Sequence, residues 1–154
     1  MRIKKALLPL LIFAVLAACL SGCGGAKTLN LTKLAQALDS GNVFDDTLGP
    51  EDKSVALSLF GLQSGDAADC VLSCSTGASV EEYALFQASD ETAAQKIVQA
   101  VQDRIRMQRG LCESYAPTEV SKLDGAIVRQ SGVYVVYVCA ADAAAAQKIV
   151  NKYL

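Results

Sequence analysis

The sequence predicts a single α+β domain in which two hairpin-helix (ββα) repeats form a four-stranded, mostly antiparallel sheet, with two N-terminal helices packed on it. Two observations lead to this prediction. The six residues Ala-Ala-Gln-Lys-Ile-Val at positions 93–98 recur at positions 145–150. Each copy follows an aspartate at the helix N-cap position, Asp90 or Asp142, and each aspartate follows an apolar run that is typical of a strand.

The first N-terminal helix is expected over residues 31–38, where three leucines and an alanine share one helical face. Asn30 occupies the N-cap position, and Gly41 follows as a stop signal. A second helix is expected to begin at Pro50, because proline and acidic residues favour a first helical turn. This helix is expected to end at Gly61.

Strands are expected over residues 70–75 and 80–88 in the first repeat, and over residues 126–130 and 133–140 in the second. A Ser-Gly turn joins the second pair into a hairpin. The last strand is apolar on both faces, which predicts a position inside the sheet with a covering layer on each side. We expect the two repeat helices to cover one face and the two N-terminal helices to cover the other.

The first 22 residues have the organisation of a bacterial lipoprotein signal peptide. A short cationic start precedes an apolar run over residues 6–20, which is too short for a permanent membrane span. The sequence Leu-Ser-Gly-Cys that ends at Cys23 matches a lipobox, whose small residues fit the signal peptidase and whose thiol receives the lipid. We therefore expect Cys23 to be the lipidated first residue of the mature protein. Cys19, which ends Leu-Ala-Ala-Cys, is the alternative.

The predicted organisation is a signal peptide at residues 1–22, a lipidated tether at residues 23–30 and one domain at residues 31–154. The tether begins with two glycines after Cys23, which suit a flexible linker. Two or three acyl chains anchor a protein stably, whereas one binds only marginally. We expect the protein on the extracytoplasmic side of the cell membrane, with the membrane as a partner through the lipid and another envelope protein as the candidate second partner.

Charge and composition exclude several classes of function. Removing Arg2, Lys4 and Lys5 with the signal peptide leaves 11 basic residues against 16 acidic ones, a net charge of −5, so we expect no nucleic-acid partner. The chain contains no histidine, which excludes Ser–His and Cys–His dyads and imidazole metal ligands. We expect no catalytic, cofactor-binding or metal-binding residue, and we interpret the protein as a non-enzymatic binding or accessory module. The alternative is a small envelope enzyme that uses carboxylate or cysteine chemistry.

Four cysteines lie in the predicted domain, and two interpretations of them stay open. An even number of cysteines outside the cytoplasm can form disulfides. Cys70 and Cys74 on one strand would lie about 13 Å apart, too far to bond to each other, so they could pair only with Cys112 or Cys139. The other interpretation is that all four are small buried thiols.

Paired acids at residues 45–46, 51–52 and 81–82 are candidates for catalysis or for calcium binding. We expect each pair to lie instead on a solvated turn or in a first helical turn, since the chain has no Asp-x-Asp-x-Asp-Gly loop. Tyr115 and Pro117 mark the end of the long helix. They predict a helix stop with the aromatic ring packed over it or, alternatively, a recognition loop.

Several segments together resemble a known family. After the lipobox come a helix ending Leu-Phe-Gly-Leu at residues 59–62, the strand Glu-Glu-Tyr-Ala-Leu-Phe at 81–86, a long helix ending Ser-Tyr-Ala-Pro at 114–117, and the strand Tyr-Val-Val-Tyr-Val at 134–138. This layout is similar to the small bacterial lipoproteins grouped as domain of unknown function 4358, over roughly residues 30–152. The resemblance implies no activity, substrate or catalytic residue.

Overall fold

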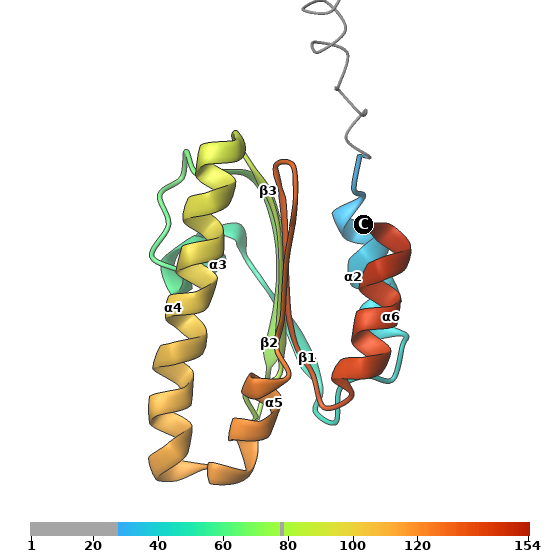
Figure 1. Cartoon of the computed structure of the whole chain (residues 1–154), viewed down its shortest axis with the longest axis vertical. Coiled ribbons are helices and arrows are strands. Elements are labelled where there is room, and N and C mark those ends of the chain that lie inside the picture. The colour runs from blue at the N-terminus through green and yellow to red at the C-terminus, as the bar shows by residue number, and fades with distance from the viewer. Residues whose placement is uncertain (1–27, 78) are drawn as a thin grey trace, which may run out of the picture.

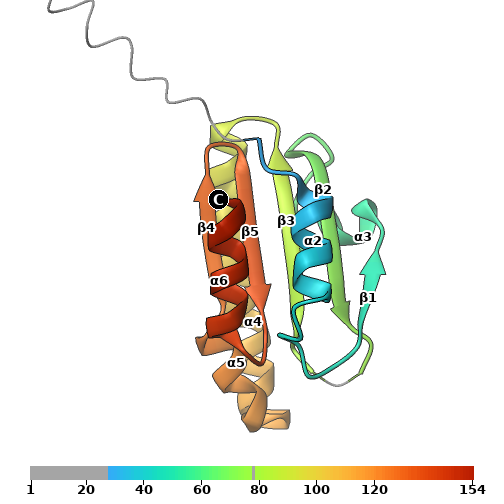
Figure 2. The same ribbon diagram turned by 90° about the vertical axis from the view of Figure 1, so that its right-hand side faces the viewer.

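The computed structural model describes residues 28–77 and 79–154, and the structural statements below refer to these residues. They form an α+β domain in which helices cover both faces of a five-stranded antiparallel sheet (Figures 1 and 2). The elements in chain order are α2 (Leu31–Asp39), β1 (Leu48–Glu51), α3 (Lys53–Leu59), β2 (Ala67–Ser75), β3 (Glu82–Ala88), α4 (Glu91–Tyr115), a 3₁₀ helix (Pro117–Glu119), α5 (Val120–Asp124), β4 (Ile127–Ser131), β5 (Tyr134–Cys139) and α6 (Ala143–Tyr153).

The strands lie in the order β1-β2-β3-β5-β4, and all neighbours are antiparallel. The predicted interior position of the last strand is confirmed, because β5 lies between β3 and β4. The predicted number of four strands is wrong, since residues 48–51 add β1 at one edge where a helix was expected to begin. Pro50 has no N–H to donate and is tolerated in an edge strand. Asp52 then takes the N-cap position, and α3 begins at Lys53.

The prediction that both repeat helices share one face of the sheet is wrong. Helices α3, α4 and α5 lie on one face, whereas α2 and α6 lie on the other (Figure 1). The 25-residue helix α4 and the short α3 already cover their face, so the C-terminal helix can bury its apolar side only on the opposite face. The two hairpin-helix units keep the predicted element order, but they are not two copies of one arrangement.

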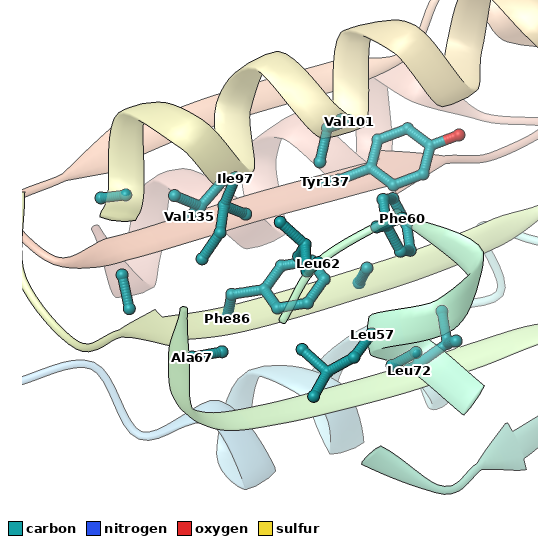
Figure 3. Close-up of a cluster of buried hydrophobic side chains, with 14 of the residues drawn as sticks. Leu57, Phe60, Leu62, Ala67, Leu72, Phe86, Ile97, Val101, Val135 and Tyr137 are labelled. Atoms are coloured by element: carbon teal, nitrogen blue, oxygen red, sulfur yellow. The ribbon is translucent and has the colours of Figure 1, made fainter. Parts of the chain in front are cut away.

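The core consists of two layers, one on each side of the sheet. Successive side chains of a strand point to opposite faces, so Phe86 packs under α3 and α4 while Leu85 packs under α2 and α6. The same alternation places Val135 and Tyr137 of β5 in the first layer (Figure 3). Because both faces of β3 and β5 are covered, these strands are apolar almost throughout.

The predicted helix starts at the two aspartates are confirmed. The backbone N–H of Ala93 donates to Asp90 Oδ1 at 2.7 Å, and that of Ala145 donates to Asp142 Oδ1 at 2.8 Å. Asn30 caps α2 in the same way. Each cap satisfies one of the backbone N–H groups that a first helical turn leaves without a partner.

The expected signal peptide, both candidate lipidation residues Cys19 and Cys23, and most of the expected tether lie outside the described residues. Within the described part of the chain, no helix is both long enough and apolar enough to cross a bilayer. The described chain starts at Thr28, at the same end of the domain as the first turn of α4 (Figures 1 and 2). The last turn of α4 and the helix α5 lie at the opposite end.

Candidate functional site

A groove of about 530 Å³ lies between the C-terminal end of α3 and the outer side of α4. Phe60 anchors the α3 side, because its ring packs edge-on against Phe86 and Tyr137, with centroids 5.3 Å and 6.1 Å away. The side chains of Leu62 and Phe60 lie between α4 and the sheet (Figure 3). The wall is apolar along most of its length and includes Leu59, Phe60, Leu62, Ala100, Arg104 and Met107.

The groove continues into a row of exposed apolar side chains on α4. Met107, Leu111 and Tyr115, here called the α4 stripe, follow one another at intervals of four residues and therefore lie on one side of the helix. Their exposed fractions are 56%, 57% and 86%. Leu59 of α3, 40% exposed, lies at the groove that Met107 also lines. The helix still packs on the sheet where the stripe begins, since Gln108 contacts the hydroxyl of Tyr137 in β5, and only the last turn of α4 extends past the strands (Figure 1).

Charged side chains surround the groove and the stripe, and they are paired within the chain. The basic groups on this side of α4 each contact a carboxylate of the same molecule, so the rim presents little unpaired charge. Such exposed pairs contribute little to stability. Because these charges are paired within the chain, the apolar stripe is the main feature that this surface offers to another molecule. The pairs are Lys96–Asp66, Arg106–Asp103, Arg109–Asp124 and Arg109–Glu113.

A buried ion pair lies behind the groove and fixes α4 on the sheet. Arg104 of α4 donates from Nε and Nη2 to the two carboxylate oxygens of Glu82 in β3, at 2.7 and 2.5 Å. The guanidinium also lies over the ring of Phe60, 5.2 Å from its centroid. Burial works to lower the pKa of Arg104, but the hydrogen bonds and charge of Glu82 outweigh it and raise that pKa. Arg104 therefore stays protonated at neutral pH, and its two hydrogen bonds to Glu82 are a structural contact between α4 and β3.

A second buried carboxylate, Glu81, ties together three segments at the end of the domain near α5. Its oxygens accept hydrogen bonds from the backbone N–H groups of Asp45 and Asp46, at 2.8 to 3.1 Å. Lys122 of α5 lies 3.7 Å from the same carboxylate and 3.2 Å from Glu119. Both carboxylate oxygens of Glu81 thus have hydrogen-bond partners within the protein, so this group is not a candidate ligand-binding residue.

The prediction that the acids at residues 81–82 lie on a solvated turn is wrong. Glu81 and Glu82 are 1% and 2% exposed, because covering layers supply Lys122 to one and Arg104 to the other. The acids at residues 51–52 are exposed, as expected, but Glu51 ends the strand β1 and only Asp52 lies at a helix start, as the N-cap of α3. Those at residues 45–46 lie in a loop, where Asp45 is exposed and Asp46 is half-buried.

The cysteines at positions 70, 74, 112 and 139 are all free thiols, so the disulfide interpretation fails, and the buried-thiol interpretation holds fully for only two of them. Cys112 and Cys139 are buried, and the other two are half-buried. Burial, reinforced by the charge of Glu82, raises the pKa of Cys74 and that of Cys139 to about 12. Burial also raises the pKa of Cys70 and that of Cys112. All four therefore remain protonated at neutral pH and are poor nucleophiles.

A smaller cavity of about 260 Å³ lies beside the loop that follows α2, and Asp39 and Asp46 are among its lining residues. A hydrogen bond from Ser75 lowers the pKa of Asp46. The Tyr83 hydroxyl donates to Asp39 at 3.3 Å. Within residues 28–77 and 79–154, no three His, Cys, Asp or Glu side chains form a potential metal site. The expected absence of a catalytic or metal site nevertheless stays a prediction.

The exposure of Tyr115 distinguishes the two interpretations of the segment that ends the long helix, a stop with the aromatic ring packed over it or a recognition loop. The helix ends at Tyr115, and Pro117 begins a 3₁₀ helix, so the predicted stop is confirmed. The predicted packing of the aromatic ring over that stop is wrong, because Tyr115 is the most exposed of the large apolar side chains in the described chain. An exposed tyrosine at a projecting helix end fits the alternative, a recognition segment.

Comparison with known proteins gives one match. The family model described as Domain of unknown function (DUF4358) matches residues 50–140, well over half of the chain. The chain belongs to this family. The match is narrower than the resemblance noted from the sequence. It runs from the last two residues of β1 through β5, includes the groove and the α4 stripe, and leaves out α2 and α6. No curated protein and no solved structure matches the DUF4358 protein.

Proposed function

We propose that this DUF4358 protein is a lipid-anchored, extracytoplasmic binding module that docks another protein of the cell envelope. The docking surface is the groove between α3 and α4 together with the α4 stripe. The observation that supports this proposal is the exposure of Met107, Leu111 and Tyr115 along one side of the C-terminal part of α4. A contiguous row of large exposed apolar side chains on a protein surface is characteristic of an interaction site.

The position of the stripe favours a protein partner over the lipid bilayer. With the anchor at Cys23, the eight-residue tether reaches at most about 29 Å and enters the domain at the end where α4 begins. Helix α4 has 25 residues and is about 37 Å long, and Tyr115 is its last residue. When the anchored domain stands upright on this tether, the stripe lies toward the end that points away from the membrane.

The chemistry of the surface favours contact with an apolar segment. Tyrosine is enriched among the side chains that supply most binding energy, and methionine is enriched in protein interfaces. The groove and stripe offer Met107 and Tyr115 next to the exposed Leu59 and Leu111. The surrounding charges are already paired within the chain. We therefore expect binding that depends little on ionic strength.

The alternative is a small envelope enzyme, and the carboxylates of the smaller cavity are its best candidates. The lowered pKa of Asp46 keeps that group ionised at neutral pH, which disfavours a role as general acid. The raised pKa values of the four thiols disfavour nucleophilic chemistry. These directions support the binding module over the enzyme.

Site-specific crosslinking in intact cells tests the docking surface. A photo-crosslinking phenylalanine derivative is placed at Met107 in the full-length anchored chain, and a control chain carries it at Lys148, an exposed position of α6 on the other face. We expect a discrete protein adduct from position 107, absent from position 148 and lost when Leu111→Glu is added. Equal adducts from both positions, or none from position 107, would contradict the proposal.

A further inference from the structure

We propose that the outer side of the layer formed by α2 and α6 binds the anionic phospholipid headgroups of a membrane surface. This inference goes beyond the proposed function, because it concerns the opposite face of the sheet from the docking surface. It starts from four exposed basic side chains, here called the α6 cations. They are Lys33 of α2, Arg129 of β4, and Lys148 and Lys152 of α6.

The α6 cations have no carboxylate partner, unlike most other basic side chains of the domain. The ion pairs of the described chain involve Lys96, Arg104, Arg106, Arg109 and Lys122, and none includes an α6 cation. Residues 1–27 and 78, outside the described part, contain no aspartate or glutamate that could pair with them. The α6 cations are therefore available to an external anion.

Three of the α6 cations form one patch. Lys148 and Lys152 are one helical turn apart and lie on the same side of α6. Asn151 lies next to Lys152, and its Oδ1 accepts a hydrogen bond from Arg129 Nη1 at 3.3 Å, which places the guanidinium beside α6. Neither α6 nor β4 contains an acidic residue, so no carboxylate interrupts the patch from these elements.

Positive and negative charges of this layer lie at opposite ends of its helices. Helix α2 begins and α6 ends at the end of the domain where the described chain starts (Figures 1 and 2). Lys33, in the first turn of α2, and Lys152, in the last turn of α6, therefore lie at this end. Asp39 ends α2 and Asp142 caps the start of α6, so both acids lie at the other ends of these helices. The carboxylate of Leu154 offsets one of the four positive charges.

Charge complementarity selects an anionic lipid surface as the occupant. The negative potential of such a surface attracts clustered lysine and arginine, and each of these residues strengthens binding about fivefold. A bilayer presents many phosphates over a wide area, which suits cations that come from three different elements. The proposed anchor enters the domain at the same end, which brings the α6 cations close to the membrane.

The negative net charge of the protein does not prevent this contact. Charges more than about 8 Å apart are largely screened at physiological ionic strength, so the local patch decides. The acids at the start of α4, Asp90 and Glu91, belong to the layer on the other face of the sheet (Figure 1). With α6 toward the membrane, α4 and its stripe face away from it. The contact is electrostatic and reversible, so small water-soluble reagents still reach α6.

Fluorescence quenching tests the inference with the full-length anchored chain in vesicles that contain a lipid with a nitroxide on its headgroup. One chain carries a fluorophore at Gln36→Cys, one helical turn from Lys33, and the control carries it at Gln102→Cys on α4; both positions are exposed. We expect quenching at position 36 in phosphatidylglycerol vesicles, little in phosphatidylcholine vesicles, and loss of the difference at high salt. No quenching at position 36, or equal quenching at both positions or in both lipids, would overturn the inference.

A matched pair of charge reversals tests which face is responsible. Lys148→Glu and Arg106→Glu change the net charge equally, and both positions are exposed, so we expect both variants to fold. Lys148→Glu should lower the equilibrium constant for the contact, obtained from the quenched and unquenched fractions, about fivefold or more. Arg106→Glu should leave it unchanged. Equal losses would mean attraction by the total charge and would contradict the inferred face.

Flotation of the same vesicles at high salt reports the anchor separately from the α6 cations. A chain that floats at high salt without quenching at position 36 would overturn this inference and leave the proposed docking function standing. If the photo-crosslinking derivative at Lys148 also captured an acidic protein in cells, that protein would be the occupant of this face, and the lipid assignment would be wrong.

Discussion

At the scale of single residues, the buried carboxylate Glu82 is the clearest test of what holds α4 in place. Replacing Glu82 with Gln leaves the guanidinium of Arg104 buried without its counter-charge. We expect the free energy of unfolding to fall by about 3 kcal/mol, because an uncompensated buried charge is costly. The measurement is urea unfolding of the purified chain.

Glu113→Gln is the matched control, since Glu113 belongs to an exposed pair with Arg109. Exposed pairs contribute about 1 kcal/mol or less, so this variant should unfold almost as the parent does. If both variants lose the same stability, the Glu82–Arg104 pair does not have the structural role assigned to it.

Glu119 makes the free energy of unfolding depend on pH in the acidic range. Burial works to raise the pKa of Glu119, but hydrogen bonds from Ser79 and Val80 and the contact with Lys122 outweigh it and lower that pKa. A lowered pKa in the folded state adds stability above the ordinary value of 4.5, and this stability is lost as the pH falls through the folded-state pKa.

Glu119→Gln should therefore reduce the dependence of unfolding free energy on pH below about pH 5 and leave a constant loss at neutral pH. Urea unfolding measured from pH 7 to pH 3 shows this slope. A variant whose slope equals that of the parent would contradict the assigned hydrogen bonds. Glu91→Gln, on the exposed first turn of α4, is the control.

The residue scale also shows where sequence reasoning succeeds and where it stops. The N-cap aspartates Asp90 and Asp142 are predictable because the group that each one binds lies three residues away. The burial of Glu82 is not, because Arg104 lies 22 residues along the chain and meets it only after α4 packs on the sheet. A carboxylate pair next to an apolar run is compatible with a turn until its distant partners are known.

At the scale of elements, two glycines have opposite effects on stability. Gly110 lies inside a helix, where glycine is unfavourable, and Gly61 lies in a left-handed turn, where glycine is favourable. Gly110→Ala should raise the free energy of unfolding by about 0.5 to 1 kcal/mol, because alanine favours a helix and its Cβ meets nothing within 4 Å. Gly61→Ala should lower it by about 1 to 2 kcal/mol, because Gly61 has φ +61° at the turn after α3. Thermal or urea unfolding of both variants measures these opposite signs, and a loss in Gly110→Ala would show that the glycine is needed within the monomer.

The elements were largely predictable, and the errors have physical reasons. Hydrophobic periodicity located α2, α4, α6 and the four longer strands to within a few residues. It missed β1, since Pro50 followed by acids fits a helix start as well as an edge strand. It also missed the α4 stripe of Met107, Leu111 and Tyr115, because the longer core-facing row of the same helix dominates the pattern. Searching the helix for a second apolar row would have found this stripe.

At the scale of the whole molecule, the layer arrangement was the part that the sequence could not supply. The internal repeat predicts that α4 and α6 are equivalent, but they pack on opposite faces of the sheet. Each helix packs on the face that the other helices leave uncovered. Periodicity reports that a helix has an apolar side and does not report which face of the sheet receives it. The projecting end of α4, and with it the candidate site, follows from this arrangement.

The anchor is tested by moving the lipidation residue. Cys23→Ser in the full-length chain should shift the protein from the membrane fraction to the medium, or stop it as an uncleaved precursor, because no thiol remains for the lipid. Cys19→Ser should leave processing and membrane association unchanged. The assignment is wrong if the Cys23→Ser protein is still processed and lipidated while the Cys19→Ser protein is not. Fractionation with detection of the lipid distinguishes these outcomes.

The most direct test of docking compares thiol labelling in cells with labelling of the dilute purified chain. Leu111→Cys places a thiol on the α4 stripe, and Lys148→Cys places one on exposed α6; the native thiols are slow because burial raises their pKa. With a membrane-impermeant maleimide on intact cells, we expect position 148 to react as fast as in the purified chain and position 111 to react about tenfold more slowly, because a partner covers it. Equal rates at position 111 in cells and in the purified chain would contradict a docking surface on α4, and no reaction at position 148 would contradict the extracytoplasmic location.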